Sequence, residues 1–449
     1  MDLGRRARKA MTDARVILWG RDIGAVSWLD DREVGVFQYA PEFVGSGIEV
    51  APLMMPLRDA PYEFPALPRD AFKGLPGLLA DSLPDRFGNA VIDAWLAREG
   101  RTPESFNPVE RLCYIGTRGM GALEFKPALF GPASRSSPIE VAALVDLANK
   151  ILDERTALAG KFSGADDAEV IEDVIKVGTS AGGARAKAIL AWNERTGEFR
   201  SGQVPGNDQF TYWLMKFDGV AGNRDRELAD PQGYGLIEYA YYLMALDAGI
   251  DMSLCRLHRE GGRAHFMTKR FDRSDRGDKL HMQSLSAMMH LDFNQADAWS
   301  YEQALQTMRR VGMTMVDIEQ QFRRAYFNVI ARNHDDHVKN IAYLMNQSGA
   351  WRLSPAFDVA YSYNPRGAWT SRHQMSINGK RDGFELDDLL ALANSGSIKP
   401  AKARDIMSEV ETSVRKWLEF ADKADVDDAT AARIKKAHRM PGEANWGKG

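Results

Sequence analysis

The sequence contains very little cysteine. Cys113 and Cys255 are the only two among 449 residues. Two cysteines cannot form a disulfide framework or a cysteine zinc cluster, so the sequence excludes both kinds of stapled fold. This usage of cysteine is typical of a protein from a reducing compartment, and we expect the chain to act in the cytoplasm.

Long hydrophobic runs are also absent. No stretch of about 18 apolar residues occurs, and no apolar segment follows the basic N-terminus, so neither a membrane span nor a signal peptide is predicted. The formal net charge is only −4, which excludes a broad electrostatic attraction between the whole surface and nucleic acid.

The residues that are present suit a large globular protein. The composition is 44% apolar and 27% charged, and a chain of this length exceeds what one hydrophobic core usually supports, so two or three packed lobes are expected. Short apolar or alternating runs predict strands at 16–19, 23–28 and 34–39, whereas helical periodicity dominates after residue 301. The predicted fold class is α+β.

The most informative segment is NHDDHVKN at residues 333–340, which is followed by an aspartate at position 358. Apolar residues spaced along one helix face predict a helix over 318–332. A buried strand at 341–345, a turn, and a returning strand at 351–353 predict a hairpin. Asp335 and Asn340 should then lie on the loop between helix and hairpin, with Asp358 just beyond the hairpin.

These three residues suit phosphoryl transfer from a metal-bound nucleotide. Asp335 can orient the attacking hydroxyl and accept its proton, while the Asn340 amide oxygen and the Asp358 carboxylate can hold Mg²⁺. A lone D-x-x-x-x-N spacing is more often only a polar loop whose side chains cap a helix end. The second aspartate after the hairpin favours a kinase over that structural interpretation.

A second candidate site is the loop GTSAGGARAK at residues 178–187. Its small residues allow backbone amides to approach a phosphate closely, and Arg185 and Lys187 bring positive charge. A strand is predicted at 188–192, so the loop lies between two strands, as in a kinase glycine-rich loop, rather than before a helix as in a P-loop. Taken alone, the loop is better explained as a glycine-rich hairpin turn without a ligand than as a phosphate site.

A lysine for the nucleotide is predicted on the apolar strand at 212–217. Lys216 is the charged residue of that strand, and an unpaired charge there costs several kcal/mol, so we expect a partner. Glu238, near the start of a helix predicted at 236–249, is the candidate for the ion pair that positions such a lysine. The alternative is an edge-strand lysine pointing to solvent, with Glu238 only favouring a helix N-terminus.

At this point the sequence resembles the HipA-like serine/threonine kinases of bacterial toxin–antitoxin modules. The loop at 178–187 resembles the family's G-x-S-x-G-G-A-x-x-K, and TKRFDR at 268–273 resembles its R-F-D-R hinge. Residues 333–340 resemble its N-x-D-x-H-x-K-N loop, and LSPAFD at 353–358 its metal loop. With the β-rich start and a similar segment at 77–86, the likeness covers about residues 15–420.

The resemblance implies a two-lobed protein-kinase-like fold with four parts. Residues 1–125 would form a small β-rich N-terminal subdomain like that of HipA. Residues 126–270 would complete the N-lobe, with the glycine-rich loop and the nucleotide lysine. Residues 271–440 would form a helical C-lobe with the catalytic and metal loops, and 441–449 a polar tail.

The resemblance also implies a role for each matching residue, with ATP and Mg²⁺ as cofactors. Asp335 is the implied catalytic residue, Asn340 and Asp358 are the implied Mg²⁺ ligands, and Lys216 is implied to contact the nucleotide phosphates. The other residues implied to bind the nucleotide are Gly182, Gly183, Ala184, Arg185, Ala186 and Lys187 over the phosphates, Lys269, Arg270 and Phe271 at the adenine, and His337, Val338, Lys339 and Phe357 around the site.

Ser180 matches the loop serine that family members autophosphorylate, which ejects the loop and stops nucleotide binding. A phosphate of about −1.5 to −2 charges beside bound phosphates would repel them. Thr179 is a second possible acceptor in the same loop. Arg185 and Asp336 depart from the family's motifs.

Substrate and partner follow only from the resemblance. It implies a protein substrate, an aminoacyl-tRNA synthetase in known relatives, and a HipB-like helix-turn-helix antitoxin that carries the complex to DNA. Three functions remain open: a protein kinase toxin, a small-molecule kinase of similar fold, and a non-catalytic co-repressor acting with an antitoxin.

Overall fold

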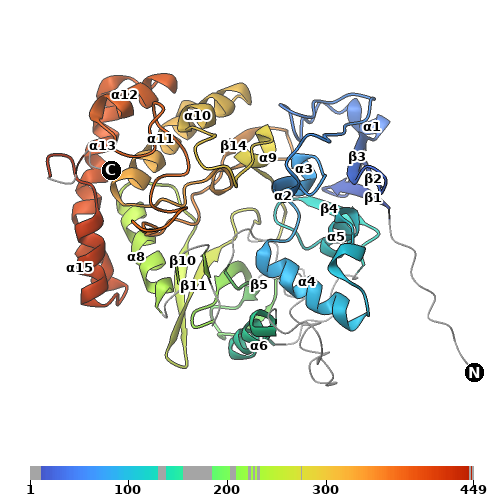
Figure 1. Cartoon of the computed structure of the whole chain (residues 1–449), viewed down its shortest axis with the longest axis horizontal. Coiled ribbons are helices and arrows are strands. Elements are labelled where there is room, and N and C mark those ends of the chain that lie inside the picture. Colours follow the sequence, from blue (N-terminus) through green and yellow to red (C-terminus); the bar gives the residue numbers. More distant parts are fainter. Residues whose placement is uncertain are drawn as a thin grey trace, which may run out of the picture.

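The structure is a computed structural model that describes residues 12–129, 138–154, 185–202, 209–220, 224–225, 228–229, 233–274, 276–443 and 446. Figure 1 shows a small sheet near the N-terminus at one end of the molecule and a group of helices from the C-terminal third at the other. A second, larger sheet lies between these two ends. Within the described residues, no helix is long and apolar enough to cross a membrane.

The N-terminal subdomain consists of the first sheet and five helices. Strands β1 (Asp13–Leu18), β2 (Arg21–Leu29), β3 (Val34–Tyr39) and β4 (Leu123–Lys126) form an antiparallel sheet in the order β3-β2-β1-β4. The three strands predicted from the alternating runs are therefore confirmed. The helices are α1 (Pro41–Val44), α2 (Arg69–Phe72), α3 (Gly77–Ala80), α4 (Arg86–Arg98) and α5 (Pro108–Ile115).

The second sheet carries the glycine-rich-loop strand and the lysine strand. Its order is β10-β11-β7-β5-β6, from β5 (Lys187–Trp192), β6 (Phe199–Ser201), β7 (Thr211–Lys216), β10 (Cys255–Glu260) and β11 (Arg263–Lys269). Helix α8 (Tyr234–Asp247) packs against β10 and β11, and α4 packs against α6 (Val141–Glu154). A two-stranded ribbon, β8 (Arg224–Asp225) and β9 (Leu228–Ala229), lies outside this sheet.

The C-terminal part is helical around one small sheet. Strands β12 (His281–Ser284), β13 (Ala342–Met345) and β14 (Trp351–Leu353) pair in that order, so the predicted hairpin is confirmed. The 3₁₀ helix η2 (Val338–Asn340) precedes β13. The helices are α9 (Leu285–Met289), α10 (Tyr301–Arg310), α11 (Met315–Ile330), α12 (Leu386–Ser395), α13 (Pro400–Arg415), α14 (Trp417–Lys423) and α15 (Asp428–Ala437).

Helix α11 positions residues 333–340, which we name the catalytic loop after the role that the sequence predicts for them. It begins three residues before the predicted start, because Thr314 and Asp317 form a capping box that satisfies the first backbone amides. The apolar face expected from the sequence, including Phe322, Tyr326 and Val329, is fully buried. The helix ends at Ile330, and Arg332 has a positive φ of 59°, which turns the chain into the loop.

Candidate active site

A side-chain contact joins the two ends of the D-x-x-x-x-N segment in the catalytic loop. The Nδ2 amide of Asn340 donates a hydrogen bond to the backbone carbonyl of Asp335 at 2.8 Å. Because the amide nitrogen is used in this way, the Oδ1 oxygen of Asn340 faces the opposite direction. The same contact holds Asp335 and Asn340 in one compact unit.

The Asp335 carboxylate is partly exposed and held by the chain after the metal loop, residues 353–358. Trp369 Nε1 donates to Oδ1 of Asp335 at 3.0 Å, and His337 Nε2 lies 3.8 Å from the same oxygen. The backbone N–H of Asp335 donates to Ser362 Oγ at 2.9 Å. The side chain is 23% exposed, so it is oriented by neighbours and still open to a reacting group.

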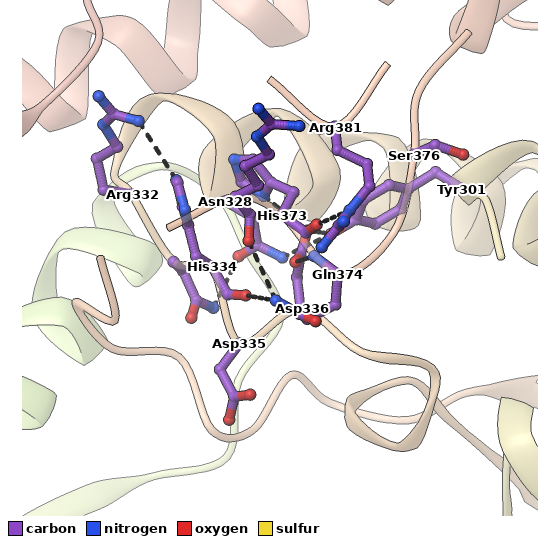
Figure 2. A network of polar contacts seen from close by, with 12 residues as sticks. Tyr301, Asn328, Arg332, His334, Asp335, Asp336, His373, Gln374, Ser376 and Arg381 are labelled. Carbon is purple, nitrogen blue, oxygen red and sulfur yellow. Dashed lines mark hydrogen bonds and ion pairs between the residues drawn. The ribbon is translucent and has the colours of Figure 1, made fainter. Parts of the chain in front are cut away.

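Asp336, the next residue, points the other way. Figure 2 shows its carboxylate inside a polar network while that of Asp335 points away from it. Asp336 accepts hydrogen bonds from the Tyr301 hydroxyl at 2.8 Å, the Gln374 backbone N–H at 2.7 Å and His373 Nδ1 at 2.8 Å. Burial raises the pKa of this carboxyl, but His373 and the other donors outweigh burial and lower its pKa.

The Asp358 carboxylate contacts Lys216 across the two lobes. Asp358 has a positive φ of 52°, and its Oδ1 accepts a hydrogen bond from the Lys216 ammonium. Burial raises the pKa of Asp358, but the charges of Lys216 and Lys187 have the larger combined effect and lower its pKa. The metal loop and the lysine strand therefore meet at one charged contact.

Lys216 has a second carboxylate partner on helix α8. Glu238 Oε1 lies 2.5 Å from Lys216 Nζ, and Glu238 is almost fully buried. Burial lowers the pKa of Lys216, but Asp358 and Glu238 outweigh burial and raise its pKa, so the ammonium stays charged. Lys216 therefore points to these two carboxylates. The alternative interpretation, in which the lysine points to solvent, is wrong.

Arg185 completes this cluster from the end of the glycine-rich loop. Its guanidinium lies 3.5 Å from Glu238 Oε2 and 3.9 Å from the centre of the Tyr234 ring. Glu238 thus lies between two cations, Lys216 and Arg185. An arginine at this position of the loop adds a third residue to the lysine–glutamate pair.

The hinge residues 269–271 lie at the end of β11, and their side chains have different surroundings. Phe271 packs on Phe357 with ring centres 5.6 Å apart. Arg270 is turned elsewhere: its guanidinium binds the Asp272 carboxylate at 2.7 Å and 2.9 Å, and its backbone N–H donates to Tyr212. The Arg270 side chain is thus committed to Asp272, and only its carbonyl could serve a nucleotide. Lys269 is partly exposed beside it.

The remaining predicted residues are placed as follows. Ala186 and Val338 are buried. His337 Nδ1 accepts a hydrogen bond from the Lys339 backbone N–H at 3.3 Å, which leaves the proton on Nε2, toward Asp335. The Lys339 ammonium lies 4.8 Å from the centre of the Phe293 ring. Residues 178–184 of the glycine-rich loop lie outside the described residues, and among them are the predicted Thr179, Ser180, Gly182, Gly183 and Ala184.

A pocket opens behind the catalytic loop. Its lining combines the catalytic loop, the metal loop and the buried end of α11, and includes Asn333, Asp336, His337, Asn340, Phe357 and Asp358. Residues far apart in the sequence therefore share one concave surface. Its volume of about 30 Å³ has room for a water or an ion, not for a nucleotide.

Two family matches cover most of the chain. The HipA-like C-terminal domain matches residues 179–418, and the HipA N-terminal domain matches residues 14–126. The chain belongs to the HipA-like family. The predicted family is therefore confirmed, since the C-terminal match alone covers more than half of the chain.

Solved structures show the fold of this HipA-like protein. HipA of Shewanella oneidensis MR-1, solved with HipB and operator DNA, aligns with a TM-score of 0.63 at 16% identity, over 94% of this chain and 95% of that one. The predicted two-lobed, kinase-like α+β fold is confirmed on this basis. The Helicobacter pylori kinase CtkA aligns at a TM-score of 0.30 and 12% identity, over 50% of this chain and 92% of that one, which supports no argument. Among proteins with curated functions, none matches significantly.

The oxygen donors of this HipA-like protein fit Mg²⁺. Asn340 Oδ1 and the Asp358 carboxylate are hard oxygen ligands, and Mg²⁺ is usually bound by one or two such groups plus phosphates and waters. In the part of the chain that the structure describes, no group of three or more His, Cys, Asp or Glu side chains forms a metal cage. The chemistry of the donors therefore suits a metal that arrives with a nucleotide.

Sequence reasoning missed the roles of Trp369 and Asp336 in this HipA-like site. Trp369 follows Asp335 by 34 positions and belongs to no motif, so no local signal indicated their contact. The sequence showed Asp336 as a second aspartate beside Asp335, but nothing in the sequence indicated its role. Its three donors explain it as the residue that anchors the chain after the metal loop.

Proposed function

We propose that this HipA-like protein is an ATP- and Mg²⁺-dependent serine/threonine protein kinase and the toxin of a toxin–antitoxin module in the cytoplasm. One observation carries the proposal: Lys216 of the N-lobe contacts Asp358 of the metal loop, next to the unit formed by Asp335 and Asn340. A lysine, a metal-binding aspartate and asparagine, and a catalytic aspartate are the parts that kinase chemistry requires.

Each residue has a proposed task. Asp335 orients the substrate hydroxyl and accepts its proton, with Trp369 and His337 holding the carboxylate. Asn340 and Asp358 hold Mg²⁺, which neutralises phosphate charge when bound. Lys216, held by Glu238, binds the phosphates in place of its contact with Asp358. These roles remain proposals, as do the domain boundaries stated from the sequence.

The nucleotide would enter between the two lobes. Phe271 and Phe357, whose rings pack together, form an apolar surface suited to the adenine, with Lys269 and the Arg270 carbonyl at the hinge. Arg185, Ala186 and Lys187 are the described end of the proposed phosphate-binding loop at 182–187. Autophosphorylation at Ser180, or at Thr179, would place negative charge beside the phosphates and release the loop.

The proposed partner is a HipB-like helix-turn-helix antitoxin. Shewanella HipA, which shares the fold, was solved with HipB and its operator DNA. The net charge of −4 on this chain supports DNA contact mainly through the antitoxin. The proposed substrate is a protein hydroxyl, with an aminoacyl-tRNA synthetase as the class that the family implies.

The test combines a purified protein and a cell lysate. Wild type incubated with labelled ATP should phosphorylate itself and a lysate protein, and EDTA or Asp335→Asn should reduce the label at least about 1,000-fold. Transfer by Asp335→Asn at the wild-type rate would overturn the assignment of the base. Label only in a small metabolite would indicate a small-molecule kinase, and absent nucleotide binding a co-repressor.

The protein substrate requires a separate measurement. Phosphoproteomics after brief expression should show sites that appear with wild type and not with Asp335→Asn. Growth arrest should follow the same pattern. Arrest by the inactive variant would contradict toxicity through phosphorylation.

A further inference from the structure

Two lysines face each other across neighbouring strands of the larger sheet. Lys187 on β5 and Lys216 on β7 are direct partners in the antiparallel register. Directly opposite residues of such a pair point to the same face of the sheet, and like charges there are destabilising. Both side chains are buried, 2% and 10% exposed. Each ammonium therefore needs its own carboxylate.

Helix α8 supplies one of these carboxylates, and the N-terminal subdomain supplies the other. Lys216 is held by Glu238, as described above. Lys187 Nζ lies 3.3 Å from Asp85 Oδ2, and the Asp85 side chain is only 3% exposed. Asp85 directly precedes α4, which Figure 1 shows beside α6 and near β5. This ion pair thus connects two parts of the chain that are distant in sequence.

The geometry of Asp85 restricts where Lys187 can point. Asp85 Oδ1 accepts the Gly88 backbone N–H at 2.6 Å as the N-cap of α4, so the side chain cannot rotate freely. Its other oxygen, Oδ2, is left facing Lys187 and has no hydrogen-bond partner among the described residues. Burial raises the pKa of Asp85, against the lowering effect of Lys187, so the carboxylate is incompletely compensated. Because the N-cap contact fixes one oxygen of Asp85, a cation held by the other oxygen has a restricted direction.

Lys187 lies close enough to the metal loop for its charge to act on Asp358. Its charge is one of the two lysine charges that lower the pKa of Asp358 against burial. An ammonium has three N–H donors, so Lys187 can bind Asp85 with one and phosphate oxygens with the others. Lys216 is arranged in the same way between Glu238 and the metal loop.

We propose that Asp85 is a positioning residue that aims Lys187 at the nucleotide phosphates, as Glu238 aims Lys216. The inference rests on the proposed kinase function, because it assumes a nucleotide in the same site. The N-terminal subdomain then supplies part of the phosphate-binding apparatus through one buried carboxylate. A merely structural ion pair between the subdomains would instead affect stability alone.

Nucleotide binding by the full chain tests this role. Asp85→Asn keeps the N-cap oxygen and removes the charge, and it should weaken binding of Mg·ATP at least about tenfold, because Lys187 loses the carboxylate that orients it toward the phosphates. Adenosine has no phosphates, so its affinity should stay within about twofold of wild type. Asp93→Asn is the matched control: Asp93 lies on the same helix, 3.6 Å from Arg111, and its loss should leave ATP affinity unchanged.

A double variant covers the case in which Asp85→Asn folds poorly. Asp85→Asn with Lys187→Met removes both charges, so thermal stability should return toward wild type while ATP affinity stays low. Recovery of ATP affinity in the double variant would show a structural role and overturn the inference. Equal ATP affinity for wild type and Asp85→Asn would also overturn the inference, while leaving the proposed kinase function untouched. Absence of ATP binding by wild type would instead overturn the proposed function, and the inference with it.

Discussion

The indole Nε1 of Trp369 donates a hydrogen bond to Oδ1 of Asp335 at 3.0 Å. The donor comes from the chain after the metal loop and the acceptor from the catalytic loop. Two more groups of this later segment contact the catalytic loop. The Ser362 hydroxyl accepts a hydrogen bond from the Asp335 backbone N–H, and the Thr370 carbonyl contacts His334 Nδ1. The orientation of the proposed base thus depends on where this segment packs.

Trp369→Phe should therefore lower kcat while leaving the KM for ATP unchanged. Phenylalanine keeps an aromatic ring at this position and cannot donate the hydrogen bond, so a decrease of about tenfold is expected from the loss of one hydrogen bond to a charged group. Losing a donor to the charged form also makes Asp335 easier to protonate, so the acidic limb of the pH–activity profile should move to higher pH.

Steady-state kinetics between pH 5 and 9 would measure both effects. Trp19→Phe is the control, because Trp19 of the N-terminal subdomain also donates through Nε1, to the Lys279 carbonyl at 2.7 Å. An unchanged kcat and profile in Trp369→Phe would contradict a positioning role for the indole.

Replacing Asp336 should lower the free energy of unfolding more than replacing Asp335. Asp336→Asn places an amide against three donors in a buried network, so the free energy of unfolding should fall by about 3 kcal/mol. Asp335→Asn alters a partly exposed carboxylate and should change stability by less than about 1 kcal/mol. Denaturant unfolding of both variants checks the contrast. Equal losses would show that the adjacent carboxylates share one role.

Glu238→Gln should impair nucleotide binding through Lys216. Without the Glu238 charge, the ammonium is held by Asp358 alone and drawn onto the proposed metal ligand. We expect the KM for ATP to rise about tenfold. Glu124→Gln removes a comparable pair with Lys279, at 2.7 Å and outside the site, and should leave the KM unchanged. A normal KM in Glu238→Gln would exclude a positioning role for this carboxylate.

His281 should make stability depend on pH. Burial lowers the pKa of His281 from 6.5 to about 4, despite the hydrogen bond between Nε2 and the Val50 carbonyl. The unfolded chain therefore takes up a proton near pH 6.5 that the folded chain does not, so this contribution is complete above pH 6.5 and lost as the pH falls toward 4. Between pH 7 and 5 it amounts to about 2 kcal/mol.

His281→Gln keeps an N–H donor near the Val50 carbonyl and removes the titration. The loss of unfolding free energy from pH 7 to pH 5 should be smaller in this variant than in wild type by that amount. Chemical unfolding at the two pH values measures the difference. Identical pH dependence in both proteins would mean that His281 takes up its proton at the same pH in the folded and the unfolded chain.

Local patterns in the sequence were sufficient to predict the elements around the site. Helix α11 and the β13–β14 hairpin follow from side-chain periods of 3.6 and 2, which depend only on neighbouring residues. The observed boundaries of α11 differ from the predicted ones, because a capping box at its start and the left-handed conformation of Arg332 after its end decide where the helix begins and ends. The motif spacings were likewise local, and they indicated the family that the comparisons confirmed.

The partners of the charged residues were decided only by the tertiary structure. The sequence by itself determined that Asp335, Asn340, Asp358, Lys187 and Lys216 are present at motif spacings. Packing decided that Trp369 holds Asp335, that Asp336 is buried among three donors, and that Asp85 reaches Lys187. The physical reason is that buried charges are stabilised by whichever opposite charges and donors the fold brings near them, and these come from chain segments that no local pattern relates.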